Sequence, residues 1–152
     1  MKQGVLGTNV IAQVALIVRD IEKTSRKMAD IFGVEKPQWF WTDPPEKAQT
    51  RYRGESSPAR AKLAFFDMGS LQLELIEPDE HPSTWREFLD THGEGVHHIA
   101  FVVKGMQDKI QALEKRGMPL VQTGEYTGGR YAYIDAVNDL KVMLELLEND
   151  NE

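Results

Sequence analysis

Four polar residues stand in segments of the chain that are largely apolar and strand-like. The segments are VIAQVALIV with Gln13, LQLELIE with Glu74, VHHIAFVV with His98, and LKVMLELLE with Glu145. Burying two carboxylates, an imidazole and an amide among aliphatic side chains costs free energy unless a partner compensates for their lost hydration. A divalent cation is the partner that would compensate for all four at once.

The atoms of this set decide which metals suit it. Because the chain has no cysteine, any metal would be held by nitrogen and oxygen ligands. One imidazole nitrogen with several oxygens suits one hard or borderline ion per site, such as Co²⁺, Ni²⁺, Mn²⁺, Zn²⁺ or Mg²⁺, with positions left for water or substrate. The sequence does not select among these ions. A single glutamate in a strand is more often exposed, so the metal hypothesis requires the four residues to converge.

An internal repeat predicts this convergence. The segment IAQVALIVRDI aligns with VHHIAFVVKGM, which places Gln13 over His98, and LELIE aligns with LELLE, which places Glu74 over Glu145. AFFD aligns with AYID in the same way. The chain is therefore predicted to be a single domain over residues 1–152, made of two modules at about 8–80 and 94–150. Two such modules usually bury their open sheets together about an approximate twofold axis, which brings equivalent positions close.

Periodicity and turn residues indicate the elements that hold these positions. Strands are predicted at 10–18, 62–68, 71–77, 97–103, 130–136 and 140–148, and helices within 19–34, 83–93 and 106–117. Thr84 and Glu87 have the spacing of a helix capping box. The segment 35–62 is rich in proline and without a sustained period, so we expect mainly a long loop or irregular hairpin over one end of the domain, with QTRYR as a possible short strand. The fold class is α+β.

Other polar residues are weaker candidates. Strand alternation predicts that His97 and His98 point to opposite faces, with His98 inward because it aligns with Gln13, and with His97 outward or behind the ligands. Arg53, in the proline-rich segment, and Arg130, after a Gly-Gly pair, are our candidates for binding an anionic part of a substrate.

Charge and composition exclude several classes of function. The formal charge of −6 over 152 residues argues against a general nucleic-acid-binding protein. The apolar run near the N-terminus is interrupted by Asn9 and Gln13, which is typical of neither a signal peptide nor a membrane span. With no cysteine in addition, we expect a cytoplasmic protein with no membrane partner.

The segments FLDTHGEGVHHIAFVV, GSLQLELIEP and DLKVMLELLE resemble the vicinal oxygen chelate superfamily, which includes glyoxalase I, methylmalonyl-CoA epimerase, bleomycin-resistance proteins and extradiol dioxygenases. The resemblance runs from about Ile11 to Glu148, except for the segment 35–62. It implies tandem βαβββ modules that form a mixed sheet around a cleft, with metal ligands at Gln13, Glu74, His98 and Glu145. Many members have histidine where this chain has Gln13, whereas a Gln, Glu, His, Glu set is similar to that of eukaryotic-type glyoxalase I.

The resemblance implies a metal-dependent lyase or isomerase that works through a metal-stabilised enolate. Glu145 is the first choice for the residue that removes and returns the proton, with Glu74 as its partner. The segment around His98 favours a methylmalonyl-CoA epimerase-like enzyme, while the ligand set favours a lactoylglutathione lyase (glyoxalase I)-like one. A non-catalytic, bleomycin-resistance-like binding protein is the third alternative. The implied partner is a small molecule with vicinal oxygens, an acyl-CoA or a hemithioacetal, and we expect a homodimer.

Overall fold

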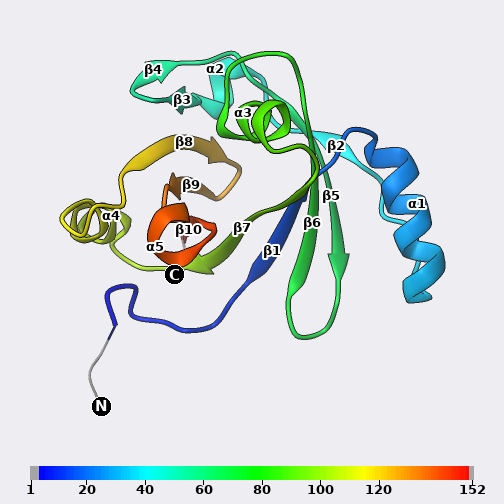
Figure 1. Ribbon diagram of the computed structural model, residues 1–152, viewed down its shortest axis with the longest axis horizontal. Coiled ribbons are helices and arrows are strands. Elements are labelled where there is room, and N and C mark those ends of the chain that lie inside the picture. The colour runs from blue at the N-terminus through cyan, green and yellow to red at the C-terminus, as the bar shows by residue number, and fades with distance from the viewer. Residues whose placement is uncertain (1–3, 151–152) are drawn as a thin grey trace.

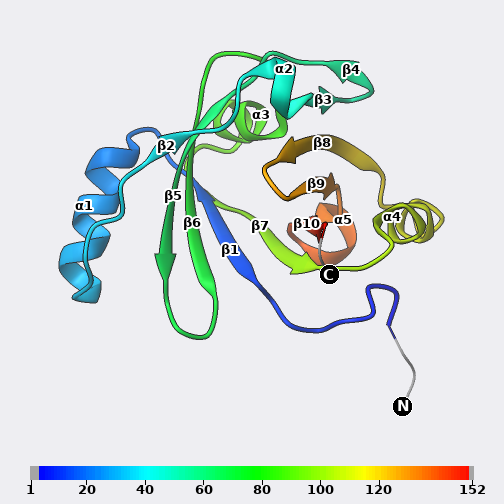
Figure 2. The same ribbon diagram turned by 180° about the vertical axis from the view of Figure 1, so that it is seen from behind.

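The computed structural model describes residues 4–150, which form one curled mixed sheet with helices on both of its faces (Figures 1 and 2). In chain order the elements are β1 (Gln13–Ile17), α1 (Ile21–Phe32), β2 (Phe40–Trp41), α2 (Pro45–Ala48), β3 (Arg51–Tyr52), β4 (Glu55–Ser56), β5 (Ala61–Asp67), β6 (Gln72–Pro78), α3 (Thr84–Thr91), β7 (Gly95–Val102), α4 (Met106–Glu114), β8 (Leu120–Tyr126), β9 (Gly129–Ile134), α5 (Val137–Leu140) and β10 (Met143–Asn149).

The sheet has the same arrangement on either side of its centre. Its strand order is β2-β5-β6-β1-β7-β10-β9-β8-β3-β4. At the centre β1 is antiparallel to β7, while β1 is parallel to β6 and β7 is parallel to β10. The order outward from β1 through β6 and β5 to β2 therefore matches the order outward from β7 through β10 and β9 to β8. The α+β class and the mixed sheet predicted from the sequence are confirmed.

Two helices cover the outer face of the sheet, one on each half. α1 begins after Asp20, whose side chain accepts a hydrogen bond from the backbone N–H of Lys23, and it ends at Gly33 in the left-handed conformation. Its buried face packs on β5 and β6, and α4 packs in the same way on the half formed by β7, β10 and β9 (Figure 1). Within residues 4–150, no helix has both the length and the apolar character needed to cross a membrane.

The third helix, α3, lies against the inner face of the curled sheet. Trp85 and Leu89 on this helix pack against Ile17 and Ile76, which are fully buried on β1 and β6. The helix is capped by Ser83, whose Oγ accepts from the backbone N–H of Arg86 at 3.0 Å. The predicted capping pair Thr84 and Glu87 is therefore wrong by one residue, because the preceding serine already satisfies the first turn. Thr84 is left free to make a different contact.

The segment 35–62 is more ordered than the expected loop. Its β2 pairs with β5 at one edge of the sheet, and its hairpin β3-β4 pairs through β3 with β8 at the other edge. In β2, Phe40 packs on Phe65 of β5, with ring centroids 5.8 Å apart. The segment thus crosses one end of the molecule, as predicted, and also extends both edges of the sheet, which was not predicted (Figure 2).

Candidate metal centre

Strand register places the candidate residues on the inner face. Ala15 of β1 is the register partner of Glu74 on β6 and of His98 on β7, and Ala100 of β7 is the partner of Glu145 on β10. Register partners project from the same face of a sheet. Both alanines are fully buried, and their small side chains leave room above β1 and β7 for the longer side chains to approach one another.

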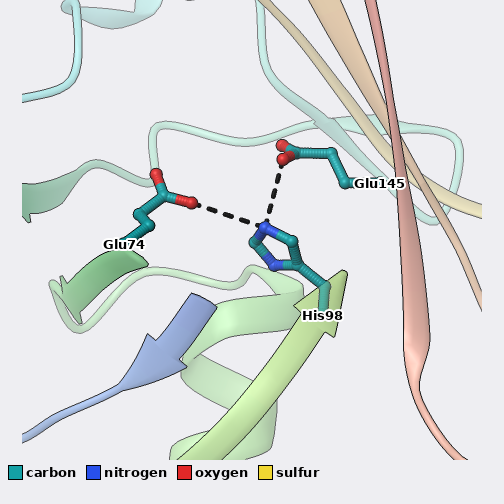
Figure 3. A group of neighbouring side chains, drawn as sticks. All are labelled: Glu74, His98 and Glu145. Carbon is teal, nitrogen blue, oxygen red and sulfur yellow. Dashed lines mark ion pairs between the residues drawn. The ribbon is translucent and has the colours of Figure 1, made fainter. Parts of the chain in front are cut away.

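Three polar side chains meet at one point on this face (Figure 3). His98 Nε2 lies 3.4 Å from Glu74 Oε1 and 3.1 Å from Glu145 Oε1. All three residues are buried, with exposed fractions of 0% for His98, 6% for Glu74 and 5% for Glu145. These three atoms have no hydrogen-bond partner of acceptable geometry. Three buried, unpartnered polar atoms directed at a common point are typical of a site that binds an ion or a water molecule.

The donor set fits a divalent metal ion. With metal–ligand bonds of about 2.1 Å, neighbouring ligand atoms at right angles lie about 3.0 Å apart, and opposite ones about 4.2 Å apart. Glu74, His98 and Glu145 each offer one ligand atom, and these atoms lie within 4.8 Å of one another. Two carboxylate oxygens and one imidazole nitrogen are suitable ligands for the hard and borderline ions named above.

Without a metal, a proton on His98 takes the place of the missing positive charge. Burial lowers the pKa of His98, but the carboxylates of Glu145 and Glu74 outweigh burial and raise this pKa to about 9. Burial, assisted by the charge of Glu145, raises the pKa of the Glu74 carboxyl, although the contact with His98 opposes the rise. The metal-free centre is thus an imidazolium between two carboxyl groups, and a metal ion would compete with that proton.

Gln13 lies on the same face but makes a different contact. It is the register partner of Ala100 on one side and of Gln72 on the other, and its amide nitrogen donates to Gln72 Oε1 at 2.5 Å. This bond uses a donor of the Gln13 amide and leaves its oxygen available as a ligand. The structure therefore brings three of the four predicted residues together, with Gln13 adjacent in the register.

The prediction that His97 and His98 point to opposite faces is wrong, and of the two places predicted for His97 the structure shows the one behind His98, not the outward one. The pairing of β1 with β7 shifts between Ala15 and Leu16, so His97 is the extra residue of a β-bulge. Both imidazoles consequently lie beside the ring of Tyr133, with ring centroids 5.3 Å away for His97 and 4.9 Å for His98. His97 is 2% exposed, and burial together with the charge of His98 lowers its pKa well below the ordinary value.

The family model of the glyoxalase/bleomycin resistance protein/dioxygenase superfamily matches residues 12–134. This chain belongs to that superfamily. Among curated proteins, an uncharacterised protein of Bacillus subtilis, YqjC, is 35% identical over 92 residues, a stretch that spans 59% of this chain and 66% of that protein.

Three solved structures share the fold. Methylmalonyl-CoA epimerase from Mycobacterium tuberculosis superimposes with a TM-score of 0.67 at 20% identity, over 99% of this chain and 93% of that one. A hypothetical protein from Bacillus halodurans gives 0.62 at 23% identity, over 93% and 95%. Methylmalonyl-CoA epimerase in complex with methylmalonyl-CoA gives 0.60 at 20% identity, over 93% and 94%. These likenesses establish the vicinal oxygen chelate fold predicted from the sequence.

The two arginines predicted to bind substrate lie away from the group formed by Glu74, His98 and Glu145. Arg53 is in an exposed turn, where its guanidinium pairs with Glu87 of α3. Arg130 is the register partner of Glu148 and directly precedes Tyr131, which faces inward. Strand alternation therefore directs Arg130 to the opposite face, where it forms ion pairs with Glu148 and Asp150. The structure thus brings neither arginine to the three converging side chains.

Two aromatic residues beside the centre were missed. Phe65 is the register partner of Glu74, and Tyr133 is the register partner of Glu145. The Tyr133 ring contacts His98, and its hydroxyl accepts a hydrogen bond from Trp85 Nε1 at 3.0 Å. A signal for both was present in the sequence, because the alignment of AFFD with AYID places Phe65 over Tyr133.

Proposed function

We propose that this protein is a divalent-metal-dependent isomerase that removes a proton from a carbon next to a carbonyl and returns it, in the manner of an epimerase. The observation that carries the proposal is the convergence of Glu74 Oε1, His98 Nε2 and Glu145 Oε1, all buried and without hydrogen-bond partners. A buried group of this kind costs stability and is typical of a functional site.

Glu74, His98 and Glu145 would hold the metal ion, and the free amide oxygen of Gln13 is the candidate for a fourth ligand. The bound ion supplies a Lewis acid, which stabilises the negative charge that develops on a carbonyl oxygen when the neighbouring C–H bond breaks. Gln72 would orient Gln13 by accepting from its amide nitrogen.

Glu145 is the first candidate for the group that moves the proton. On β1 the exposure of inward-facing positions increases away from α3, from 0% at Ile17 and Ala15 to half-buried at Gln13. Ile11, which precedes the strand, is 38% exposed. A substrate would therefore enter from the Ile11 end. Glu145 lies in the same register row as Gln13, nearer that end than the row of Glu74 and His98.

The two carboxylates come from opposite sides of His98, which suits an epimerase. Glu74 is on β6 and Glu145 is on β10, at matching positions of the two halves of the sheet. Glu145 would accept the proton at one face of the substrate carbon while the C–H electron pair moves toward the carbonyl. Glu74, carrying a proton on the oxygen that does not bind the metal, would return that proton at the other face, which would leave Glu145 protonated and Glu74 ionised. Phe65 and Tyr133, beside these carboxylates, and α3 at the closed end would keep bulk water out.

The likeness in fold to methylmalonyl-CoA epimerases supports an acyl-CoA with a carboxylate-bearing branched carbon, methylmalonyl-CoA first, as the substrate to test. A second candidate is isomerisation of a hemithioacetal, in which the proton returns to the adjacent carbon. One observation favours it: the amide of Gln13 lies on the same face as Glu74, His98 and Glu145. Together these residues form a Gln, Glu, His, Glu set, which is similar to the ligand set of eukaryotic-type glyoxalase I.

The test combines metal content with solvent exchange. We expect about one divalent ion per chain, and metal-dependent uptake of deuterium from ²H₂O at the 2-position of methylmalonyl-CoA. A Glu145→Gln variant should keep its fold and lose about 10²- to 10⁴-fold in exchange rate. Glu125→Gln, at a half-exposed strand position on β8, is the matched control and should exchange at the wild-type rate.

Each outcome separates the alternatives. Turnover of the hemithioacetal of methylglyoxal and glutathione, with no exchange in methylmalonyl-CoA, would select the glyoxalase-type reaction. Full activity in Glu145→Gln would end the role given to that residue. A wild-type protein that takes up no metal after reconstitution would refute the proposal of a metal-dependent enzyme. It would favour a protein that binds a small molecule without catalysis.

A further inference from the structure

His97 is a buried residue of the site region that neither the proposed metal set nor the proton transfer uses. Its Nδ1 lies 2.8 Å from Nδ1 of His98, and its Nε2 lies 3.1 Å from Oγ1 of Thr84. Only the bulge in β7 makes the first contact possible, because neighbouring residues of a regular strand point to opposite faces. All three side chains are buried, so water does not compete for these hydrogen bonds.

The short distance between the two Nδ1 atoms permits one proton between them. A neutral imidazole carries its proton on one nitrogen and accepts with the other. If Nε2 of His98 binds a metal ion, the His98 proton is on Nδ1 and must be donated to Nδ1 of His97. A proton on Nδ1 of His97 would clash with it, so His97 has to carry its own proton on Nε2 and donate it to Thr84.

Thr84 is held for this contact by groups other than its hydroxyl. Ser83 supplies the helix cap, so the Thr84 side chain does not turn back onto its own helix. The Thr84 backbone N–H donates to Gln122 Oε1 at 2.8 Å, and the Gln122 amide donates to the Tyr131 hydroxyl at 3.0 Å. These bonds fix the first turn of α3 relative to β8 and β9.

We propose that His97 is a positioning residue, which with Thr84 fixes the proton of His98 on Nδ1 and so keeps Nε2 of His98 free to bind a metal ion. The inference rests on the proposed metal-dependent function. Metal-binding histidines in proteins generally donate their second N–H to a fixed acceptor, and loss of that acceptor typically weakens metal binding about 10- to 100-fold. Here the acceptor is a second imidazole, whose direction Thr84 sets.

The test uses a variant that removes only the hydroxyl. Thr84→Val keeps the β-branched shape and the backbone N–H, whereas Thr84→Ser keeps the hydroxyl. Thr91→Val is the matched control, because Thr91 lies on the exposed side of the same helix, where its hydroxyl bonds the Glu87 carbonyl. Zn²⁺ affinity is measured by chelator competition, and ¹⁵N NMR of the imidazoles in the Zn²⁺-loaded protein reports which nitrogen of each ring carries the proton.

In the wild type we expect the His97 proton on Nε2 and the His98 proton on Nδ1. Thr84→Val should weaken Zn²⁺ binding about 10- to 100-fold and change the His97 signals, while Thr84→Ser and Thr91→Val stay close to wild type. Wild-type protein that binds Zn²⁺ with the His97 proton on Nδ1, or an unchanged affinity in a folded Thr84→Val variant, would overturn this inference alone. Absence of Zn²⁺ binding in the wild type would overturn the proposed function as well.

Discussion

Raising the pH of the metal-free protein should destabilise it, because His98 then loses the proton that stands between two buried carboxyl groups. The folded pKa of His98, about 9, lies above the ordinary value of 6.5. A group whose pKa is raised by folding contributes stability that is fully present below the unfolded pKa and is lost as the pH rises through the folded one. The window of loss is therefore pH 6.5 to 9.

The size of the effect follows from the same two values. Each pKa unit corresponds to about 1.4 kcal/mol, so a shift of this size corresponds to a loss of about 3 kcal/mol in the free energy of unfolding across the window. His98 has an exposed fraction of 0%, so solvent does not screen its interaction with the two carboxylates. A loss of this size is a large fraction of the stability of an ordinary domain.

The assay is urea unfolding at intervals from pH 6 to pH 10 in the presence of a chelator. His98→Gln, which cannot titrate, should show a much flatter profile, and saturating Zn²⁺ should remove the loss in the wild type because the ion replaces the proton. A wild-type profile that stays level between pH 6.5 and 9 would refute the reasoning, since His98 would then be unprotonated or outside the field of the carboxylates.

Two further predictions concern the packing behind the centre. Gly124→Ala should destabilise the fold by about 1 to 3 kcal/mol in urea unfolding, because a Cβ there would overlap the half-buried ring of Tyr131, whereas Gly4→Ala meets open space and should be neutral. Trp85→Phe should cost about 1 to 3 kcal/mol by leaving the Tyr133 hydroxyl without its donor. Adding Tyr133→Phe should then cost less than it does in the wild type, and strictly additive losses would contradict the contact.

The regular elements could be predicted from the sequence because they are long enough to show a period. The helix predicted within 19–34 is α1, and its end at Gly33 was marked by the glycine. The strands β2, β3 and β4 have two residues each, too few for any period. β2 and β3 also join the sheet through strands farther along the chain, β5 and β8. Of the three short strands, only β3 was anticipated, as a possibility in QTRYR. Where they pair depends on edges that exist only after folding.

The candidate centre could be predicted to the extent that the repeat carries it. The alignment related His98 to Gln13 and Glu74 to Glu145, and the register puts these residues on one face. The position of His97 could not be predicted, because the bulge depends on how β7 pairs with Ala15 and Leu16 rather than on the sequence of β7 itself. The arginines were chosen for charge alone, and the acidic neighbours that engage them come from other elements.

The segment 35–62 has a consequence for self-association. Through β2 it pairs with Lys62 and Leu63 of β5, and through β3 with Gln122 and Thr123 of β8, so one stretch of chain occupies part of the outer edge of each half. Both β5 and β8 have seven residues, and long regular edges of this kind recruit strands from other molecules. The part of the chain that diverges most from the repeat is therefore the part that limits strand addition at both ends of the sheet. A shortened form without it would be expected to assemble edge to edge.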